Sequence, residues 1–208
     1  TTPLFSIKKI QRYQSLLIIK NASHFISEIT TFPPHQNIGK PLSKQLPKAP
    51  SFLMPILMEL IEKHRLFPWG ESVFSYTPSF YDTHHKTGAI VAKTEIVVGI
   101  GKALQMDYTP LKNTTGDTDT DLLEKTISAL EKTKTHDFVL LHINGIDEAS
   151  HRKNTQEKID FIGKIDRLVL DYCKKNAPAT LSITVCADHE TCCKTGRHIT
   201  SSVAYYDL

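Results

Sequence analysis

The sequence predicts an α/β fold with a mainly parallel sheet, and two observations support this prediction. From about Lys86 onward, short apolar runs alternate with amphipathic stretches, which is typical of βαβ units. Clusters of Asp and His follow two of these apolar runs directly, and ligands of open α/β sheets bind at the carboxyl ends of strands. At 208 residues the chain is long enough for one such domain of ordinary size.

The pattern of residues 86–208 predicts three buried strands and three helices. The strongest helix signal has Leu122, Leu123, Ile127 and Leu130 on one face, with acids at its start and lysines at its end, as the helix dipole favours. The other elements follow from apolar runs and from apolar residues at helical spacing. The predicted strands are 88–92, 136–143 and 181–187, and the predicted helices are 94–104, 119–134 and 155–176.

Residues 1–85 differ in character and predict a cap or insertion beside a core formed by residues 86–208. Most of the eleven prolines lie in residues 1–68, and residues 32–50 read as an irregular loop. A strand is predicted over 13–20 and a helix over 51–64, with Pro55 near the first helical turn.

Composition narrows the class of protein. The net charge is +3, and basic and acidic residues are interspersed along the chain. The sequence therefore does not predict the concentrated basic face of a nucleic-acid binder. The sequence has no signal segment and no run of eighteen apolar residues, which argues against a membrane partner. Four cysteines without a spaced CxxC pair indicate a reducing, cytoplasmic setting. Small anionic substrates remain compatible with these features.

Two segments carry the chemistry, "GIDEASH" and "ADHETCCKTGRH". Asp147 and His151 are four residues apart, so one helical turn or a tight loop could direct both at a single cation. Asp188 and His189 are adjacent, and His198 follows nine residues later. These five hard or borderline ligands are enough for most of two neighbouring metal sites.

Each cluster alone has a simpler explanation. An Asp-x-x-x-His pair is more often an exposed helix pair than a metal site, and an Asp-His dipeptide often caps a turn. Both clusters, however, follow strongly apolar strands at the predicted active edge of the sheet. This coincidence favours metal binding.

Four segments closely resemble the archaeal-type cofactor-independent (2,3-bisphosphoglycerate-independent) phosphoglycerate mutases of the alkaline phosphatase superfamily. They are "GIDEASH", "ADHETCCKTGRH", "NTTGDTDTDLLEK" and "TEIVVGIGKALQMDY", and the similarity spans roughly residues 10–198. The resemblance implies an alkaline phosphatase-like three-layer core with a smaller cap. It also implies interconversion of 3-phosphoglycerate and 2-phosphoglycerate through a phosphoserine.

The same resemblance implies two divalent cations. Asp147, His151 and His198 would hold one ion, and Asp188 and His189 would hold the second. Mn²⁺ is favoured, with Zn²⁺, Co²⁺ or Mg²⁺ as alternatives, because Asp and His accept all four.

Residues on the substrate side both match and depart from the family pattern. Gln14 stands where relatives have an Arg, and Gln36 where they have an Asp; loss of the Arg removes a bidentate anion contact. The expected substrate-binding residues are Arg12, His35, Asp119 and Lys125.

The family's opening strand, with an aspartate ligand, and its serine nucleophile in a Gly-Ser-Asp turn have no counterpart here. We therefore expect a chain truncated at its N-terminus. Two other functions remain open: another phosphatase or mutase of the same superfamily, and a catalytically silent metal-binding or structural domain.

Overall fold

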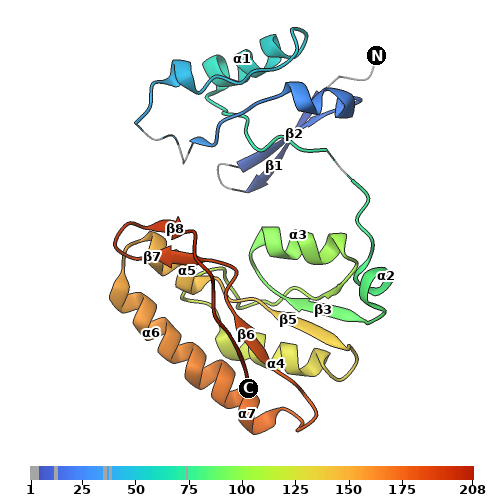
Figure 1. The fold of residues 1–208 in the computed structure, drawn as a ribbon, viewed down its shortest axis with the longest axis vertical. Coiled ribbons are helices and arrows are strands. Elements are labelled where there is room, and N and C mark those ends of the chain that lie inside the picture. Colours follow the sequence, from blue (N-terminus) through green and yellow to red (C-terminus); the bar gives the residue numbers. More distant parts are fainter. Residues whose placement is uncertain (1–4, 12–13, 35–36, 38, 74) are drawn as a thin grey trace. The chain divides into compact units, whose positions relative to one another are not determined.

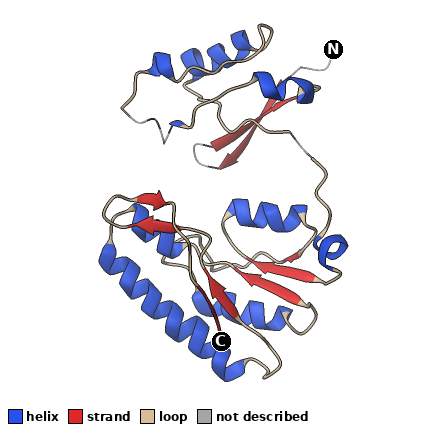
Figure 2. Ribbon diagram, in the orientation of Figure 1, coloured by secondary structure: helices blue, strands red, loops and turns tan. Residues whose placement is uncertain are grey.

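The computed structural model describes residues 5–11, 14–34, 37, 39–73 and 75–208. The chain divides into two compact units, Thr1–Tyr76 and Thr77–Leu208. Each unit is described by itself (Figures 1 and 2). The division falls after Tyr76 rather than after residue 85, and the assignment of a cap and a core stays a prediction.

The first unit combines an antiparallel strand pair with one regular helix. The helix buries Leu57, Leu60 and Ile61 on one face and carries Pro in its first turn, as its sequence predicts. It ends where Arg65 adopts a left-handed conformation with φ 54°. The elements are β1 (Phe5–Gln11), β2 (Gln14–Ile19), the 3₁₀ turns η1 (Ser23–Glu28) and η3 (Leu42–Lys44), and α1 (Met54–His64). Strand β1 was not predicted.

The second unit is built on a parallel three-stranded sheet of order β4–β3–β5. Helix α3 lies on one face of this sheet and α4 on the other (Figure 1). Because the chain moves from β3 outward to β4 and then back past β3 to β5, the strand order reverses at β3. The elements are α2 (Phe80–His84), β3 (Gly88–Val91), α3 (Glu95–Ala103), β4 (Asp107–Tyr108), α4 (Leu122–Lys132) and β5 (Phe138–Leu141).

Strand β3 is the buried centre of this sheet. Ala89, Ile90 and Val91 are each no more than 1% exposed. Gly101 lets α3 approach β3 closely, since a Cβ there would lie 2.8 Å from Ile90 Cγ2. Ile90 also packs with Met106, so strand, helix and β4 share one apolar cluster.

A second apolar cluster joins α4 to the long C-terminal helical segment through Leu122, Phe161 and Val169. Helix α4 begins after Asp121, whose carboxylate accepts a hydrogen bond from Glu124 N at 2.8 Å. The predicted helix 155–176 is continuous but contains a π turn. Its parts are α6 (Thr155–Ile165), η4 (Asp166–Leu170) and α7 (Asp171–Asn176).

The predicted third buried strand, 181–187, is wrong in its burial. Strand β6 (Thr184–Cys186) lies outside the parallel sheet and pairs antiparallel with β9 (Tyr205–Asp207). Thr184 and Cys186 are exposed, because within the described residues only β9 borders this strand. The apolar run "LSITVC" predicted the strand but not its neighbours.

A short hairpin completes the unit. Strands β7 (Glu190–Cys192) and β8 (Arg197–Ile199) pair so that Thr191 faces His198. Gly196 makes the turn possible, with φ 68° and a 2.7 Å hydrogen bond from its N–H to Cys192 O. Among the described helices, none combines the length and apolar character that a membrane span requires.

We predict that Gly101→Ala lowers the free energy of unfolding by about 1–3 kcal/mol, because the added methyl group meets the buried Ile90. Gly163→Ala is the matched control. Its methyl group would meet only Arg167 Nη1 at 3.5 Å, so helix propensity should raise stability by up to about 1 kcal/mol. Urea unfolding of the two variants measures the difference. Equal changes in the free energy of unfolding for the two variants would show that α3 does not pack closely on β3.

Candidate metal centre

Helix α5 (Gly145–His151) begins three residues after β5 and places the first two candidate ligands. Gly145 allows the helix to start against α6, since a Cβ there would lie 2.6 Å from Phe161 Cε1. One helical turn then brings His151 Nε2 to 3.2 Å from Asp147 Oδ2. Of the helical turn and the tight loop expected for this pair, the structure has the helical turn.

The β7–β8 hairpin brings the other ligands to the same point. His198 Nε2 lies 3.2 Å from His151 Nε2 and 3.7 Å from Asp147 Oδ1. Asp147, His189 and His198 each offer a ligand atom, and these atoms lie within 4.8 Å of one another. We refer to Asp147, His151, His189 and His198 together as the Asp147 cluster.

A hydrogen bond orients the ring of one histidine and places a proton on its Nδ1. His151 Nδ1 lies 2.9 Å from Gly196 O, and a carbonyl oxygen can only accept. Nδ1 therefore carries a proton, and Nε2 is the ring nitrogen that points toward Asp147 and His198 and could bind a cation in the neutral ring. A carboxylate and several imidazole nitrogens that converge in this way form a donor set that fits Mn²⁺, Zn²⁺ or a similar cation.

Thr191 supports the cluster from β7. Its hydroxyl donates to Asp147 Oδ1 at 2.5 Å and lies 3.3 Å from His189 Nδ1. This hydrogen bond restricts the orientation of the carboxylate. Thr191 was not predicted from the sequence, although its position two residues after His189 puts both on one side of an extended segment.

Asp188 lies at the rim of the cluster. Its side chain is 81% exposed, and its Oδ2 is 3.6 Å from His189 Nε2. The structure thus brings four of the five predicted metal ligands into one cluster, with Asp188 beside it. His189 groups with Asp147 and His198, so the division of these ligands between two ions stays a prediction.

The predicted substrate-binding residues occupy different settings. Arg12 and His35 lie outside the described residues. Asp119 is exposed and accepts a hydrogen bond from Thr115 Oγ1. Lys125 is only 1% exposed, and its Nζ donates to His142 O at 3.1 Å and to Thr115 O at 3.5 Å.

Burial has a clear electrostatic effect on Lys125. Removal from water, followed by the charge of Lys93, lowers the pKa of Lys125 from its ordinary 10.5 to about 8. The pKa of His142 is also lowered, again mainly by burial and then by the charge of Lys125. Within the described residues, His142 Nδ1 and Thr94 Oγ1 are buried without a hydrogen-bond partner.

These groups lie at a position where open sheets bind ligands. Thr94 follows β3 and His142 follows β5, at the carboxyl ends of two paired parallel strands. Ligands of such sheets enter where the strand order reverses, which here is at β3. The Asp147 cluster begins a few residues beyond the same end of β5.

Comparison with known proteins finds one matching family and several similar proteins. The metalloenzyme superfamily profile matches residues 17–205. A 2,3-bisphosphoglycerate-independent phosphoglycerate mutase from Methanosphaerula palustris is 39% identical over 119 residues, which cover 57% of this chain and 28% of that protein. One from Methanosarcina barkeri is 30% identical over 203 residues, covering 86% of this chain and 50% of that protein.

Two solved structures are also similar. A Pyrococcus horikoshii protein has a TM-score of 0.60 and 27% identity, over 64% of this chain and 40% of that one. The cofactor-independent phosphoglycerate mutase from Thermoplasma acidophilum has a TM-score of 0.51 and 21% identity, over 88% of this chain and 52% of that one, which supports the fold. The chain therefore spans about half or less of the length of each of these four proteins. Because the superfamily profile extends over most of the sequence, the chain belongs to the metalloenzyme superfamily, and the predicted alkaline phosphatase-like α/β fold is confirmed.

Proposed function

We propose that this chain is the metal-binding part of a phosphoglycerate mutase that interconverts 3-phosphoglycerate and 2-phosphoglycerate. One observation carries the proposal: α5 and the β7–β8 hairpin, far apart in the chain, converge on the Asp147 cluster. The proposed reaction is supported by relatives that are named as phosphoglycerate mutases.

In this proposal Asp147, His151 and His198 hold one divalent cation, and Asp188 and His189 hold the second. Mn²⁺ is the favoured ion. Bound cations would neutralise charge on the phosphoryl group and lower the pKa of an attacking hydroxyl. The phosphoryl group passes through a phosphoserine, whose serine we place outside these 208 residues. His151 and Thr191 hold the ligand geometry through their bonds to Gly196 O and Asp147 Oδ1.

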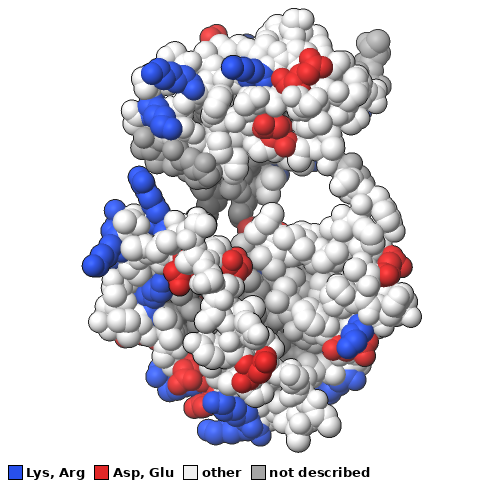
Figure 3. Space-filling model, viewed as in Figure 1, with Lys and Arg blue, Asp and Glu red and all other residues white. Residues whose placement is uncertain are grey.

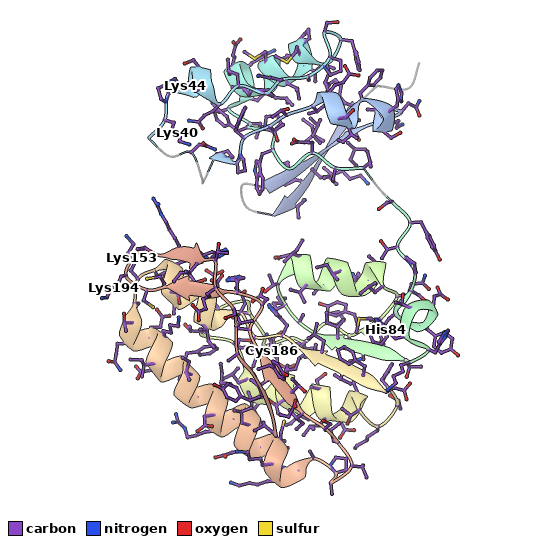
Figure 4. All side chains as sticks on the ribbon, viewed as in Figure 1. Lys40, Lys44, His84, Lys153, Cys186 and Lys194 are labelled. Carbon is purple, nitrogen blue, oxygen red and sulfur yellow. The ribbon has the colours of Figure 1, made fainter. Side chains whose placement is uncertain are left out.

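Basic side chains near the cluster support an anionic substrate. Lys153 and Lys194 lie at the same end of the second unit, beside β7 and β8 (Figure 4). Lys153 also lies against the hairpin turn, because a Cβ on Gly196 would come within 3.3 Å of Lys153 Cε. Lys and Arg side chains gather over this side of the unit (Figure 3). Positive charge at the site raises the local concentration of a phosphorylated acid.

Phosphoglycerate binding would also involve the predicted residues Arg12, His35 and Asp119. For Lys125, the hydrogen bonds to two backbone carbonyls support a positioning role. Lys125 joins the loop that contains Thr115 to the residue that follows β5. The setting proposed for the whole protein is cytoplasmic.

Gln14 and Gln36 favour one alternative, a phosphatase or mutase of the same superfamily that acts on another phosphate ester. The test measures isomerisation of 3-phosphoglycerate and hydrolysis of p-nitrophenyl phosphate by the complete protein that includes the proposed serine, with and without Mn²⁺. Metal-dependent isomerisation supports the proposed mutase. Hydrolysis alone supports the alternative. Metal-dependent binding of 3-phosphoglycerate with neither reaction would indicate a catalytically silent domain.

We predict that His151→Ala lowers the affinity for Mn²⁺ by at least about tenfold, because it removes a ligand atom 3.2 Å from Asp147 Oδ2. Isothermal titration calorimetry measures the change. His84→Ala is the control, since His84 is an exposed residue at the end of α2 (Figure 4). Unchanged Mn²⁺ binding in His151→Ala would remove this residue from the metal site.

We also predict a pH-dependent stability that comes from Lys125. Its folded-state pKa is about 8 and its ordinary value is 10.5, so the unfolded chain binds more protons between these values. Stability should therefore rise by up to about 3 kcal/mol as the pH increases through this window. Lys125→Met should lack this rise, because methionine has no group that titrates. Parallel pH curves for the two proteins, measured by urea unfolding, would contradict this account.

A further inference from the structure

Helix α3 presents an apolar face that the described residues of the second unit leave exposed. Ile96 is 69% exposed and Ile100 is 54% exposed. Gly99 and Ala103 are also exposed, and the four residues follow the i, i+3, i+4, i+7 spacing of one helical face. The opposite side of α3 holds Gly101 against Ile90, so this helix already has its partner in the sheet.

Gly99 adds a second observation. A glycine inside an exposed helix lowers helix stability by about 1 kcal/mol relative to Ala. Gly101 has a reason within the fold, because a Cβ there would meet Ile90. At Gly99, in contrast, a Cβ would have no described atom within 4 Å apart from its own neighbours. Close approach of another backbone is the physical condition that would favour glycine at this position.

Two side chains of opposite charge lie beside this face, one at each end of the helix. Glu95 lies in the first turn of α3 and Lys102 in its last turn, two helical turns apart on the same flank of the apolar face. Lys102 Nζ lies 5.3 Å from the centroid of the Tyr108 ring. In the described part of the chain, neither Glu95 nor Lys102 forms an ion pair.

We propose that this face of α3 binds α3 of a second copy of the chain in an antiparallel, twofold-symmetric contact. When two identical helices run antiparallel, the same flank of each faces the other. Glu95 then lies opposite the partner's Lys102, and Lys102 lies opposite the partner's Glu95. Ile96 packs beside the partner's Ile100, and the helices cross at Gly99, where the missing side chain permits a close approach.

The face is self-complementary in both shape and charge, which is what distinguishes a second copy from an unrelated partner. A parallel, twofold-symmetric arrangement would place Glu95 and the partner's Lys102 at opposite ends of the contact, so it would gain neither of these ion pairs. The contact rests on one helix per chain, so the association should be weak and should depend on concentration. This inference does not depend on the proposed enzymatic function.

Sedimentation equilibrium of the full 208-residue chain at low salt tests the contact. We expect a reversible dimer. Glu95→Lys alone and Lys102→Glu alone should each raise the dimer dissociation constant by about tenfold or more, because two like-charge contacts form in each dimer. The double variant Glu95→Lys/Lys102→Glu restores both attractions and should dimerise like the wild type.

Mixing the two single variants gives the sharpest result. Each should dimerise poorly alone, because the flank carries two positive charges in Glu95→Lys and two negative charges in Lys102→Glu. An equimolar mixture should form a heterodimer, because the positive flank of one variant then faces the negative flank of the other. The control is the swap Glu131→Lys/Lys134→Glu, together with its single variants, at an exposed ion pair near the end of α4. These control changes should leave the dimer dissociation constant unaffected.

Three outcomes would overturn the proposal. The first is a chain that stays monomeric up to about 1 mM. The second is a dimer whose strength does not change in the single variants of α3. The third is a mixture of the single variants that associates no better than each variant alone. Thermal unfolding of both variants checks that they are folded.

Discussion

The site depends on one hydrogen bond, from His151 Nδ1 to Gly196 O at 2.9 Å. It joins the end of α5 to the turn of the β7–β8 hairpin and also selects the tautomer of His151. Thr191 makes the second connection, through Asp147. Because Gly196 adopts φ 68°, a side chain at this position would strain the turn that presents the carbonyl. Backbone conformation, ring tautomer and ligand direction are therefore coupled.

The core fixes where this coupling occurs. Strand β5 pairs with the buried β3, and the chain turns into α5 directly after it. Gly145 and Phe161 set how closely α5 lies against α6, and Phe161 is almost completely buried. A fully buried aromatic side chain contributes about 2–3 kcal/mol, so the ligands rest on a rigid base rather than on a free loop.

The sequence was most informative where a pattern is local. The spacing of Asp147 and His151 predicted that they share a direction, and the acids and lysines around Leu122 located α4 within three residues at each end. The hairpin and Thr191 were missed, because three-residue strands such as Glu190–Cys192 have too little period to recognise. The predicted burial of β6 was wrong, because the pairing of a strand depends on residues far away in the sequence, here Tyr205–Asp207. Arg12 and His35 lie outside the described residues, so their assignment stays a prediction.

Two histidine side chains of the Asp147 cluster are open to water, which affects how the protein would handle ions. The side chain of His198 is 55% exposed, and that of His151 is 40% exposed. A cation held by such groups would stay in contact with water and could exchange with ions in solution. The occupying element would then be set by which ions the surroundings supply and by their intrinsic preference for nitrogen and oxygen donors. Material purified in different buffers would carry different metals.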